Sequence, residues 1–374
     1  MKGFPMRVLL FEPNPHHYEV IPGFAYYFDK MGYEIDCLVQ KADWQGDVFT
    51  RSSSLKEKIN FYYYQKEDWK YQIEELQKLY KYDLLFSTSF DLWGGDHWRN
   101  VYKELEEIDH SRLGVVGCYH AFSTYEENRR NCFIPIERIV SLSPVISNEG
   151  AFTEVNANYF SDSVDKRPKN QMVRILSIGM STNRYDLWNT IRDVVKKTKK
   201  PVSLICVGRK TQKKKQILKY IIYRFLNIEI PCRYKNWPPL LHQWISKRRL
   251  SVQYNASFQI LFREVEKADF LDASILPIFR TEFTNNRTSG IKQLSLGFLK
   301  PCIIEKAVAD YYGFTEKNAI IYEEGNLVEA INRAVCLSDE EYCNMVMEVE
   351  KLCNEIRNRS ERNLREMFSR LNSL

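Results

Sequence analysis

Three residues suited to binding an anion stand directly before an apolar helical pattern. Thr288, Ser289 and Gly290 precede a stretch that stops at Lys300 and Pro301. A helix start offers unpaired backbone N–H groups and the positive end of the helix dipole, and a glycine lets an anion approach closely. The pattern therefore predicts a helix start that binds an anion. The alternative is that Thr288 only caps the helix and binds nothing.

Basic side chains that could share such an anion follow two strand-like runs. Arg184 lies downstream of "RILSIGM", and Arg209 and Lys210 follow "LICVG". Guanidinium groups suit anions of the phosphate type because they form paired hydrogen bonds. A surface arginine is more often only solvated, so this assignment depends on where the strands end.

Histidines follow two strand-like runs of the first half. His120 ends "VVGCYH", and His16 and His17 lie in "EPNPHHYE", the loop after the first strand. A histidine at the carboxyl end of a parallel strand is placed to face a ligand. His16 or His17 could bind a hydroxyl group of a substrate, and Glu19 could serve as a base. Alternatively, His120 has only a structural role, and the loop that contains His16 and His17 is simply exposed to solvent.

Strand-like and helical patterns alternate through the first half of the chain. Helices are expected after Pro22, ending at Gly32, then over Asp68 to Tyr80 and near residues 98–108. The strand-like runs are "MRVLLFEP", "EIDCLVQ", "KINFYYY", "YDLLFST", "RLGVVGCYH" and "RIVSLSP". Strands that alternate with helices predict parallel βαβ units and a doubly wound sheet.

The same rhythm restarts after a polar stretch, residues 161–171, that is typical of a linker. Strands are expected at "VRILSIGM", "PVSLICVG", residues 250–254, "ASILPIF" (273–279), "PCIIE" and "AIIY". The fold class predicted is α/β, with two doubly wound Rossmann-like domains, residues 1–165 and 166–338, facing across a cleft. Residues 339–374 carry the apolar spacing of one or two amphipathic helices, which we expect to cross back onto the first domain.

These segments resemble the GT-B glycosyltransferases, particularly the retaining, family 4-like group that builds bacterial surface polysaccharides. That family has an "aD…lP" strand followed by a loop, a helix and "GKPV". The counterparts here are Ala268-Asp269, "ILPIF", Thr288-Ser289-Gly290 and "LKPCII"; "VVGCYH", "IVSLSP" and "VNANYFSD" resemble segments of the first domain. The resemblance implies that the helix start, Arg184, Arg209 and Lys210 hold the diphosphate of a nucleotide sugar, and that His120 faces the transferred sugar.

Further donor contacts follow from this resemblance. The family often has two glutamates spaced E-x7-E around this helix, the second of which holds the donor ribose, whereas Asn286 and Leu294 stand there in this chain. Glu282 and Gln293 lie nearby, so Glu282, Asn286 and Gln293 are the candidates for the ribose or the sugar. Tyr254 and Asn255 follow a strand of the second domain and are the candidates for contacting the base.

The composition limits the class of protein. The chain has 374 residues, of which 44% are hydrophobic and 27% charged, as in a globular protein of two domains. No run approaches the roughly 18 apolar residues that cross a bilayer, so the expected location is the cytoplasm. A net charge of +6 is too weak to imply a nucleic-acid partner. Nine cysteines without a C-x-x-C pair favour buried structural thiols over disulfides or zinc.

Two features bear on metals and membranes. No D-x-D pair occurs, which argues against a carboxylate metal clamp, and neither a metal nor a cofactor is expected beyond the nucleotide sugar itself. Residues 209–227 mix five Lys and two Arg with apolar residues at helical spacing. Such a helix can lie on the anionic inner membrane as a peripheral contact. The alternative is a solvated basic face over a buried stripe.

The expected function is metal-independent transfer of a sugar to a glycan or lipid-linked acceptor, in capsule, O-antigen or exopolysaccharide synthesis. Retention of configuration is favoured over inversion. Two alternatives stay open: a nucleotide-sugar epimerase on the same fold, and a non-catalytic protein that binds a nucleotide sugar.

Overall fold

The structure is a computed structural model that describes residues 6–13, 17–42, 44–65, 68–89, 105, 107–108, 114–119, 136–142, 146–147, 150–151, 153–166, 168–178, 194, 202–208, 250–254, 257–273 and 290–371. The chain divides into two compact units. The first comprises Met1–Val164, Ile278–Gly297 and Lys351–Leu374, and the second comprises Asp165–Pro277 and Phe298–Glu350. The predicted domain boundaries stay predictions.

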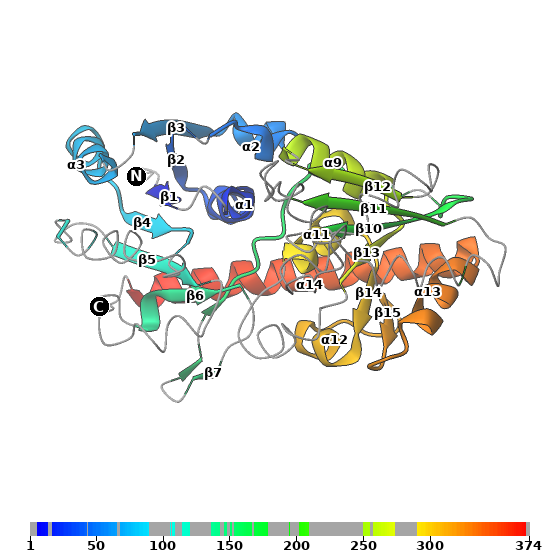
Figure 1. The fold of residues 1–374 in the computed structure, drawn as a ribbon. Coiled ribbons are helices and arrows are strands. Elements are labelled where there is room, and N and C mark those ends of the chain that lie inside the picture. Colours follow the sequence, from blue (N-terminus) through cyan, green and yellow to red (C-terminus); the bar gives the residue numbers. More distant parts are fainter. Residues whose placement is uncertain are drawn as a thin grey trace, which may run out of the picture. The chain divides into compact units, whose positions relative to one another are not determined.

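The first unit is built on a seven-stranded sheet with the order β3-β2-β1-β4-β5-β6-β9, in which each pair is parallel (Figure 1). Strands β2 and β3 lie on one side of β1, whereas β4 and the strands that follow it lie on the other. The direction in which successive strands are added to the sheet therefore reverses between β1 and β4. The strands are β1 (Arg7–Phe11), β2 (Glu34–Gln40), β3 (Ile59–Tyr64), β4 (Leu84–Ser87), β5 (Gly114–Tyr119), β6 (Ile139–Ser141) and β9 (Thr153–Glu154).

Two helices of the first unit begin and end where the sequence predicts, whereas most of the helix expected near residues 98–108 lies outside the described residues. Helix α1 (Ile21–Met31) has Pro22 in its first turn and ends at Gly32, whose φ of 83° is in the left-handed region that favours glycine. Helix α3 (Trp69–Leu79) matches the expected helix from Asp68 to Tyr80. The other short elements are η1 (Tyr18–Val20), η2 (Asp47–Phe49), α2 (Ser53–Lys56), η4 (Ile136–Arg138) and the hairpin of β7 (Ile146–Ser147) and β8 (Gly150–Ala151).

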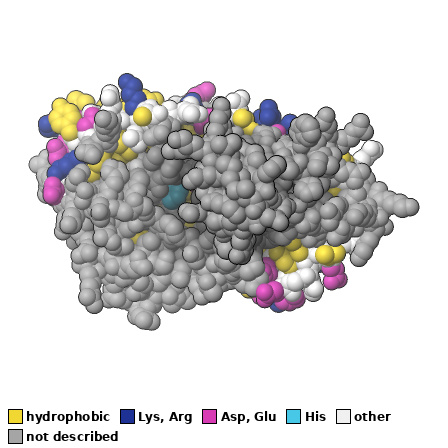
Figure 2. Space-filling view, in the orientation of Figure 1, with side chains coloured by type: hydrophobic (Ala, Val, Ile, Leu, Met, Phe, Trp, Pro, Cys, Tyr) yellow, Lys and Arg dark blue, Asp and Glu magenta, His cyan; other side chains and the backbone are white. Residues whose placement is uncertain are grey.

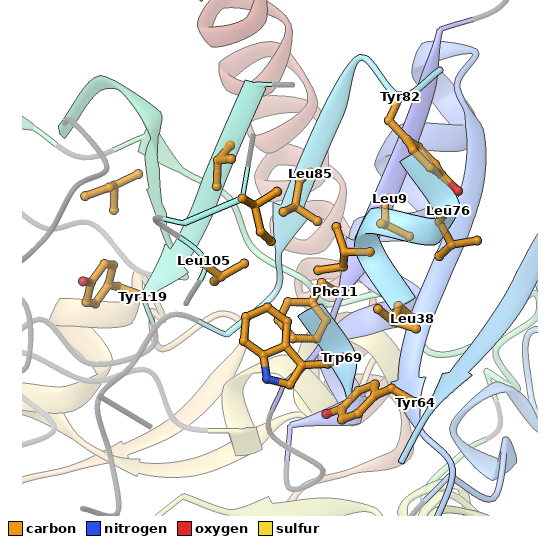
Figure 3. Close-up of a cluster of buried hydrophobic side chains, with 14 residues drawn as sticks. Leu9, Phe11, Leu38, Tyr64, Trp69, Leu76, Tyr82, Leu85, Leu105 and Tyr119 are labelled. Atoms are coloured by element: carbon orange, nitrogen blue, oxygen red, sulfur yellow. The ribbon is translucent and has the colours of Figure 1, made fainter. Parts of the chain in front are cut away.

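Alternate side chains of the central strands cover the two faces of this sheet. On one face Leu9, Phe11 and Leu85 belong to a buried cluster completed by α3, where the rings of Phe11 and Trp69 stack with centroids 5.1 Å apart (Figure 3). On the other face Phe86 packs against α1. Because both faces are buried, the strands read as nearly continuous apolar runs.

The segment after β9, residues 155–160, runs buried through the first unit. The hydroxyl of Tyr27 donates to the Asn156 carbonyl oxygen at 2.6 Å, and the Asn156 N–H donates to the Ser360 hydroxyl at 3.0 Å. Ser360 lies on α14 (Asp339–Leu371), whose Phe368 stacks on Phe28 of α1. The carboxy-terminal helix thus returns to the first sheet, as the predicted fold class requires.

The second unit repeats the plan. Its six-stranded sheet has the order β12-β11-β10-β13-β14-β15, again parallel throughout, so the direction of building reverses between β10 and β13 (Figure 1). This is the strand order of a Rossmann sheet. The elements are β10 (Val173–Ile178), β11 (Val202–Gly208), β12 (Leu250–Tyr254), α9 (Phe258–Lys267), β13 (Phe270–Asp272), β14 (Cys302–Glu305), α12 (Lys306–Tyr312), β15 (Ala319–Tyr322) and α13 (Leu327–Cys336).

One strand of the second sheet begins before the apolar run that was expected to form a strand, residues 273–279. Of that run only Ala273 is described, and it lies just after β13; the rest of the expected strand lies outside the described residues and stays a prediction. Phe270 and Leu271 of β13 are fully buried and pair with β10. The preceding Asp269 fixes this register by accepting hydrogen bonds from the backbone N–H groups of Arg174 and Asn170. Helix α12 was not predicted.

Helix α11 (Gly290–Phe298) packs against the buried segment through a glycine. A Cβ at Gly297 would lie 2.5 Å from the Phe160 ring and 2.6 Å from the Asn158 carbonyl oxygen, whereas a Cβ at Gly290 would meet nothing within 4 Å. Contacts below 3.0 Å force the neighbours to move. Gly297 is therefore required by packing, and Gly290 is not.

We expect Gly297→Ala to lower the free energy of unfolding by about 1–3 kcal/mol, as other overpacking substitutions do. Gly290→Ala is the matched control in the same helix and should leave the free energy of unfolding unchanged or raise it, because alanine favours helix over glycine. Urea unfolding of both variants measures the difference. Equal stability of the two variants would contradict this packing.

Candidate functional site

Polar side chains gather where the first sheet reverses its direction of building. Strand β1 is followed by Glu12, and β4 is followed by Thr88 and Ser89. The parallel ladder continues past the strands, since the Thr88 N–H donates to the Phe11 carbonyl oxygen at 2.9 Å. In open α/β sheets ligands bind at the carboxyl ends of the strands beside such a reversal.

Glu12 is the carboxylate of this cluster. Its side chain is 0% exposed, and its Oε2 accepts hydrogen bonds from Thr88 Oγ1 at 2.7 Å and from Ser89 Oγ at 2.8 Å. A buried carboxylate needs such donors, because burial without them is costly. Burial first, and then the carboxylates of Glu12 and Asp36, raise the pKa of the Cys37 thiol well above its ordinary value. Cys37 is therefore a protonated structural thiol, as the sequence predicts.

His17 extends the cluster towards solvent. Its Nδ1 lies 3.0 Å from Ser89 Oγ, and the ring is only half-buried. Figure 2 shows a histidine side chain that is visible on the face of the molecule drawn there. His17 stands directly before η1, so the short helix fixes its backbone. Glu12, Thr88, Ser89 and His17 form what we call the β1–β4 network.

The sequence predicted only part of this network. His17 was an expected acceptor-side residue, but Glu12, Thr88 and Ser89 were not singled out. Glu12 carried a signal, since it is an acidic residue directly after a strand whose apolar residues are all buried. Glu19, the expected base, lies half-buried in η1. Its role stays a prediction, and the carboxylate that contacts the Ser89 hydroxyl is Glu12.

The second sheet carries a smaller polar pair at its own reversal. Ser177 of β10 donates from Oγ to Asp272 Oδ2 of β13 at 2.7 Å, and the two residues are register partners in the ladder. Their exposures are 4% and 1%, so the pair is buried at the edge where a ligand of this unit would bind.

Two residues that were predicted to contact the nucleotide sugar, Gly290 and Gln293, lie on α11. Gly290 is its first residue and is exposed. Gln293 is 3% exposed and donates from Nε2 to Asn156 Oδ1 at 3.3 Å, while its Oε1 has no hydrogen-bond partner within the described part of the chain. Helix α11 thus ends at Phe298, before Lys300 and Pro301, as the sequence predicts.

Lys292, next to Gln293, is buried in the first unit. Burial lowers the pKa of its amine to about 8, an effect that Glu154 partly offsets and Arg359 strengthens. Glu154 forms an ion pair with Arg359 at 3.2 Å and accepts from Asn156 Nδ2 at 2.8 Å. The first turns of α11 therefore rest on a buried polar cluster.

The remaining predicted site residues are not placed by the structure. Tyr254 ends β12, and its side chain is not described. The whole basic segment 209–227 lies outside the described residues, and so do the following: His16, His120, Arg184, Arg209, Lys210, Asn255, Glu282, Asn286, Thr288 and Ser289. Their roles stay predictions.

Within the described ranges, no three His, Cys, Asp or Glu side chains come together as a metal site. No helix in the described part of the chain is long and apolar enough to cross a membrane.

Comparison with known proteins supports the predicted α/β fold with two Rossmann-like domains. No protein-family model matches the sequence, and no curated protein matches it. Among solved structures, a glycosyltransferase from Rickettsia africae has a TM-score of 0.55 at 11% identity over 98% of each chain. An α-glucosyltransferase in complex with UDP and DNA has a TM-score of 0.53 at 13% identity, over 96% of this chain and 94% of that one. Anabaena HepE in complex with UDP-glucose has 0.50 at 11%, over 99% and 100%.

The chain has the GT-B fold. The two parallel sheets with alternating helices are those of GT-B enzymes, and the likeness extends over nearly the whole chain. At 11–13% identity the likeness establishes the architecture alone. The chemistry has to be argued from the residues of the GT-B sheets.

The buried amine of Lys292 predicts a pH dependence of stability. Between pH 8 and 10.5 the unfolded chain keeps this proton and the folded chain has lost it. The free energy of unfolding therefore gains up to about 1.4 kcal/mol per pH unit from this group as the pH rises. Lys292→Met removes that gain.

Urea unfolding of both proteins at several pH values from 7.5 to 10 tests this. The stability of the variant minus that of the parent should fall as the pH rises, and tyrosine titration cancels in the difference. A difference that does not change with pH would place the Lys292 pKa near its ordinary value.

Proposed function

We propose that this chain moves a sugar from a nucleotide diphosphate sugar to a hydroxyl group of a glycan or lipid-linked acceptor. The observation that carries the proposal is the β1–β4 network, a carboxylate, two hydroxyls and an imidazole at the reversal of a GT-B sheet. HepE was solved with UDP-glucose and the α-glucosyltransferase with UDP. A donor of that class is what we propose here.

On the acceptor side, His17 is the residue that we propose binds the acceptor hydroxyl. Its ring is half-buried, and its Nδ1 lies 3.0 Å from Ser89 Oγ. His16 and Glu19 are proposed as neighbouring acceptor contacts. His120, which follows β5, is proposed to face the transferred sugar and to steady positive charge at its anomeric carbon.

On the donor side, Thr288, Ser289 and Gly290 at the start of α11 are proposed to bind the diphosphate through backbone N–H groups and the helix dipole. Arg184, Arg209 and Lys210 would neutralise its charge. Because the sequence has no D-x-D pair, we propose that these groups act without a metal or another cofactor. The ribose, sugar and base contacts are proposed for Glu282, Asn286, Gln293, Tyr254 and Asn255.

In the proposed reaction the acceptor oxygen forms a bond to the anomeric carbon of the sugar. The bond from that carbon to the diphosphate oxygen breaks, and its electron pair leaves with the nucleoside diphosphate. The hydroxyl proton goes to His17 when configuration inverts, and to the departing diphosphate oxygen when it is retained. The resemblance in sequence favours retention, while a base on the acceptor side favours inversion. Proton NMR of the new anomeric signal separates the two.

The setting that we propose is bacterial surface polysaccharide synthesis at the inner face of the cytoplasmic membrane. The basic segment 209–227 would make the peripheral contact with anionic lipids. We propose no nucleic-acid partner, since the net charge is only +6.

A donor screen followed by an activity assay tests the proposal. UDP, GDP, CMP and dTDP are compared by thermal shift, since a ligand at 100 times its dissociation constant adds about 2.7 kcal/mol to stability. Nucleotide sugars that contain the nucleotide found to bind are then incubated with the protein and candidate acceptors. Transfer supports the proposal, isomerised nucleotide sugar alone would identify an epimerase, and binding without any turnover would identify a non-catalytic protein.

We expect His17→Ala and His120→Ala each to lower turnover on the order of a hundredfold while leaving nucleotide affinity intact. The reason is that both residues are proposed to contact reacting groups and not the diphosphate. Steady-state kinetics and calorimetric titration with the nucleotide measure the two effects. Full activity in a folded alanine variant would remove that histidine from the mechanism.

We expect Gly290→Trp to weaken nucleoside diphosphate binding at least tenfold, because a bulky side chain at the helix start would block the approach of the anion. Gly290→Ala is the matched control at the same position. Titration with UDP or the nucleotide found in the screen is compared with titration by the corresponding nucleoside, which lacks the diphosphate. Unchanged diphosphate affinity in folded Gly290→Trp would count against this site.

A further inference from the structure

We propose that Trp44, Gly46 and Lys56 form a subsite for an anionic group, a carboxylate or a phosphate, that the acceptor carries. The inference rests on the proposed function for the identification of the ligand as an acceptor. Binding of the anionic group itself can be measured on the protein without any donor.

Two hydrogen-bond donors meet beside Gly46, which has no side chain. A Cβ at Gly46 would lie 3.4 Å from Lys56 Nζ and 3.6 Å from Trp44 Nε1. The ammonium and the indole N–H therefore border one small space that a side chain would otherwise fill. The φ of Gly46 is 69°, in the left-handed region that favours glycine, so the backbone itself disfavours most side chains here.

These two donors have no acceptor in the part of the chain that the structure describes. Within it, neither Trp44 Nε1 nor Lys56 Nζ forms a hydrogen bond or an ion pair. Asp47, the residue after Gly46, lies in the same described range and forms no ion pair with Lys56 there. Lys56 is exposed, and Trp44 Nε1 is open to solvent although the residue is half-buried. Both donors are thus available to a ligand.

A carboxylate or a phosphate group satisfies both donors at once. Such a group has at least two acceptor oxygens, so one can accept from the indole N–H and another from the ammonium. A neutral hydroxyl group would also bring a proton, for which these two donors offer no acceptor. The missing side chain of Gly46 lets the oxygens approach the backbone closely. The donor set therefore favours an anionic group over a neutral sugar hydroxyl.

The frame of this subsite is fixed by aromatic packing and by short helices. The indole ring of Trp44 packs against Phe61 of β3, with centroids 5.2 Å apart, and against Phe49 of η2. The backbone N–H of Trp44 donates to the Gln40 carbonyl oxygen at 3.0 Å, which ties the residue to the end of β2. Lys56 is the last residue of α2. Packing thus holds the indole, while the lysine side chain can adjust to the ligand.

The subsite lies at the same edge of the first sheet as the proposed acceptor contact. Trp44 follows β2 and His17 follows β1, and the carboxyl ends of these parallel neighbours share one edge. Tyr18, the residue after His17, makes a T-shaped contact with Trp44, with ring centroids 5.0 Å apart. Its hydroxyl oxygen accepts from the Gln40 N–H at 3.2 Å. An acceptor bound through a hydroxyl group at His17 can therefore extend past Tyr18 to the subsite.

The test is nuclear magnetic resonance of protein labelled with 15N in tryptophan and glycine. Trp44→Phe identifies the indole signal of Trp44, and Gly46→Asn identifies the amide signal of Gly46, by their loss. Methyl β-glucuronide, inorganic phosphate and methyl β-glucoside are added in separate titrations at constant ionic strength. We expect saturable shifts of both signals with at least one of the two anions and none with the neutral glucoside. A response to the glucuronide alone identifies a carboxylate ligand, and a response to phosphate alone identifies a phosphate ligand.

Variants of the lysine and the glycine test the two halves of the subsite. Lys56→Met should weaken binding of the anion about fivefold or more, and Lys56→Arg, which keeps the charge, should retain it. Gly46→Asn should abolish the shift of the Trp44 signal in a folded protein, because asparagine tolerates the left-handed region and its side chain fills the space.

Lys81→Met is the matched control, since Lys81 is also exposed but precedes β4, at the opposite edge of the same sheet. It should leave the affinity for the anion unchanged. Three results would each overturn the proposal: no shift with either anion, an equal shift with the glucoside, and equal affinity in Lys56→Met and Lys81→Met. Because both lysines are exposed, neither variant depends on repacking of the core.

Activity separates this inference from the proposed function. With the donor found in the screen, Lys56→Met should raise the KM for an acceptor that carries the anionic group about fivefold, with little change in the KM for the donor. Anion binding beside Trp44 in a protein without transferase activity would support the subsite and contradict the proposed function. Transferase activity in a protein whose Trp44 signal responds to neither anion would do the opposite.

Discussion

The pairing of β1 with β2 on one side and β4 on the other is the constraint on which the candidate site depends. Parallel strands end at the same edge, so the residues that follow β1 and β4 must meet. That pairing brings Glu12 beside Thr88 and Ser89, which are 76 and 77 positions away in the chain. The helix that follows β1 then determines where His17 lies. Without the reversal between these strands, neither the carboxylate nor the hydroxyls would have their partners.

The buried segment 155–160 is the second organising feature of the first unit. A Cβ on Gly23 of α1 would lie 2.5 Å from Ala157, and one on Gly297 of α11 would lie as close to Phe160, so both helices contact this segment with bare backbone. Ser360 of α14 accepts from the Asn156 N–H. Three helices distant in sequence are thus held by one strand-like segment. This explains why part of α11 and the end of α14 belong to the unit that begins the chain.

Among the described residues, the two reversals carry different polar groups. The second sheet has a buried Ser177–Asp272 pair, in which the hydroxyl and the carboxylate satisfy each other. The first sheet adds a half-buried imidazole to a similar pair, and this addition gives the network a group that can exchange a proton with a ligand. A GT-B fold does not by itself specify a reaction. The proposed transfer to a hydroxyl rests on the groups at the first of these edges.

The sequence by itself determined the strands and helices whose pattern is local. The run "EIDCLVQ" is β2 from its first residue to its last, and Pro22 and Gly32 mark the two ends of α1. Strands and helices that alternate twice around a polar linker also indicated two doubly wound domains, and the resemblance of the motifs to those of a known family indicated the GT-B fold. The sequence did not predict that Phe270 to Asp272 form β13, because pairing with β10, which is distant in the sequence, places that strand. The partnership of Glu12 with Ser89, and the burial of Lys292 beside Glu154, were decided by tertiary structure alone. Each depends on contacts between distant parts of the chain, which periodicity and spacing do not encode.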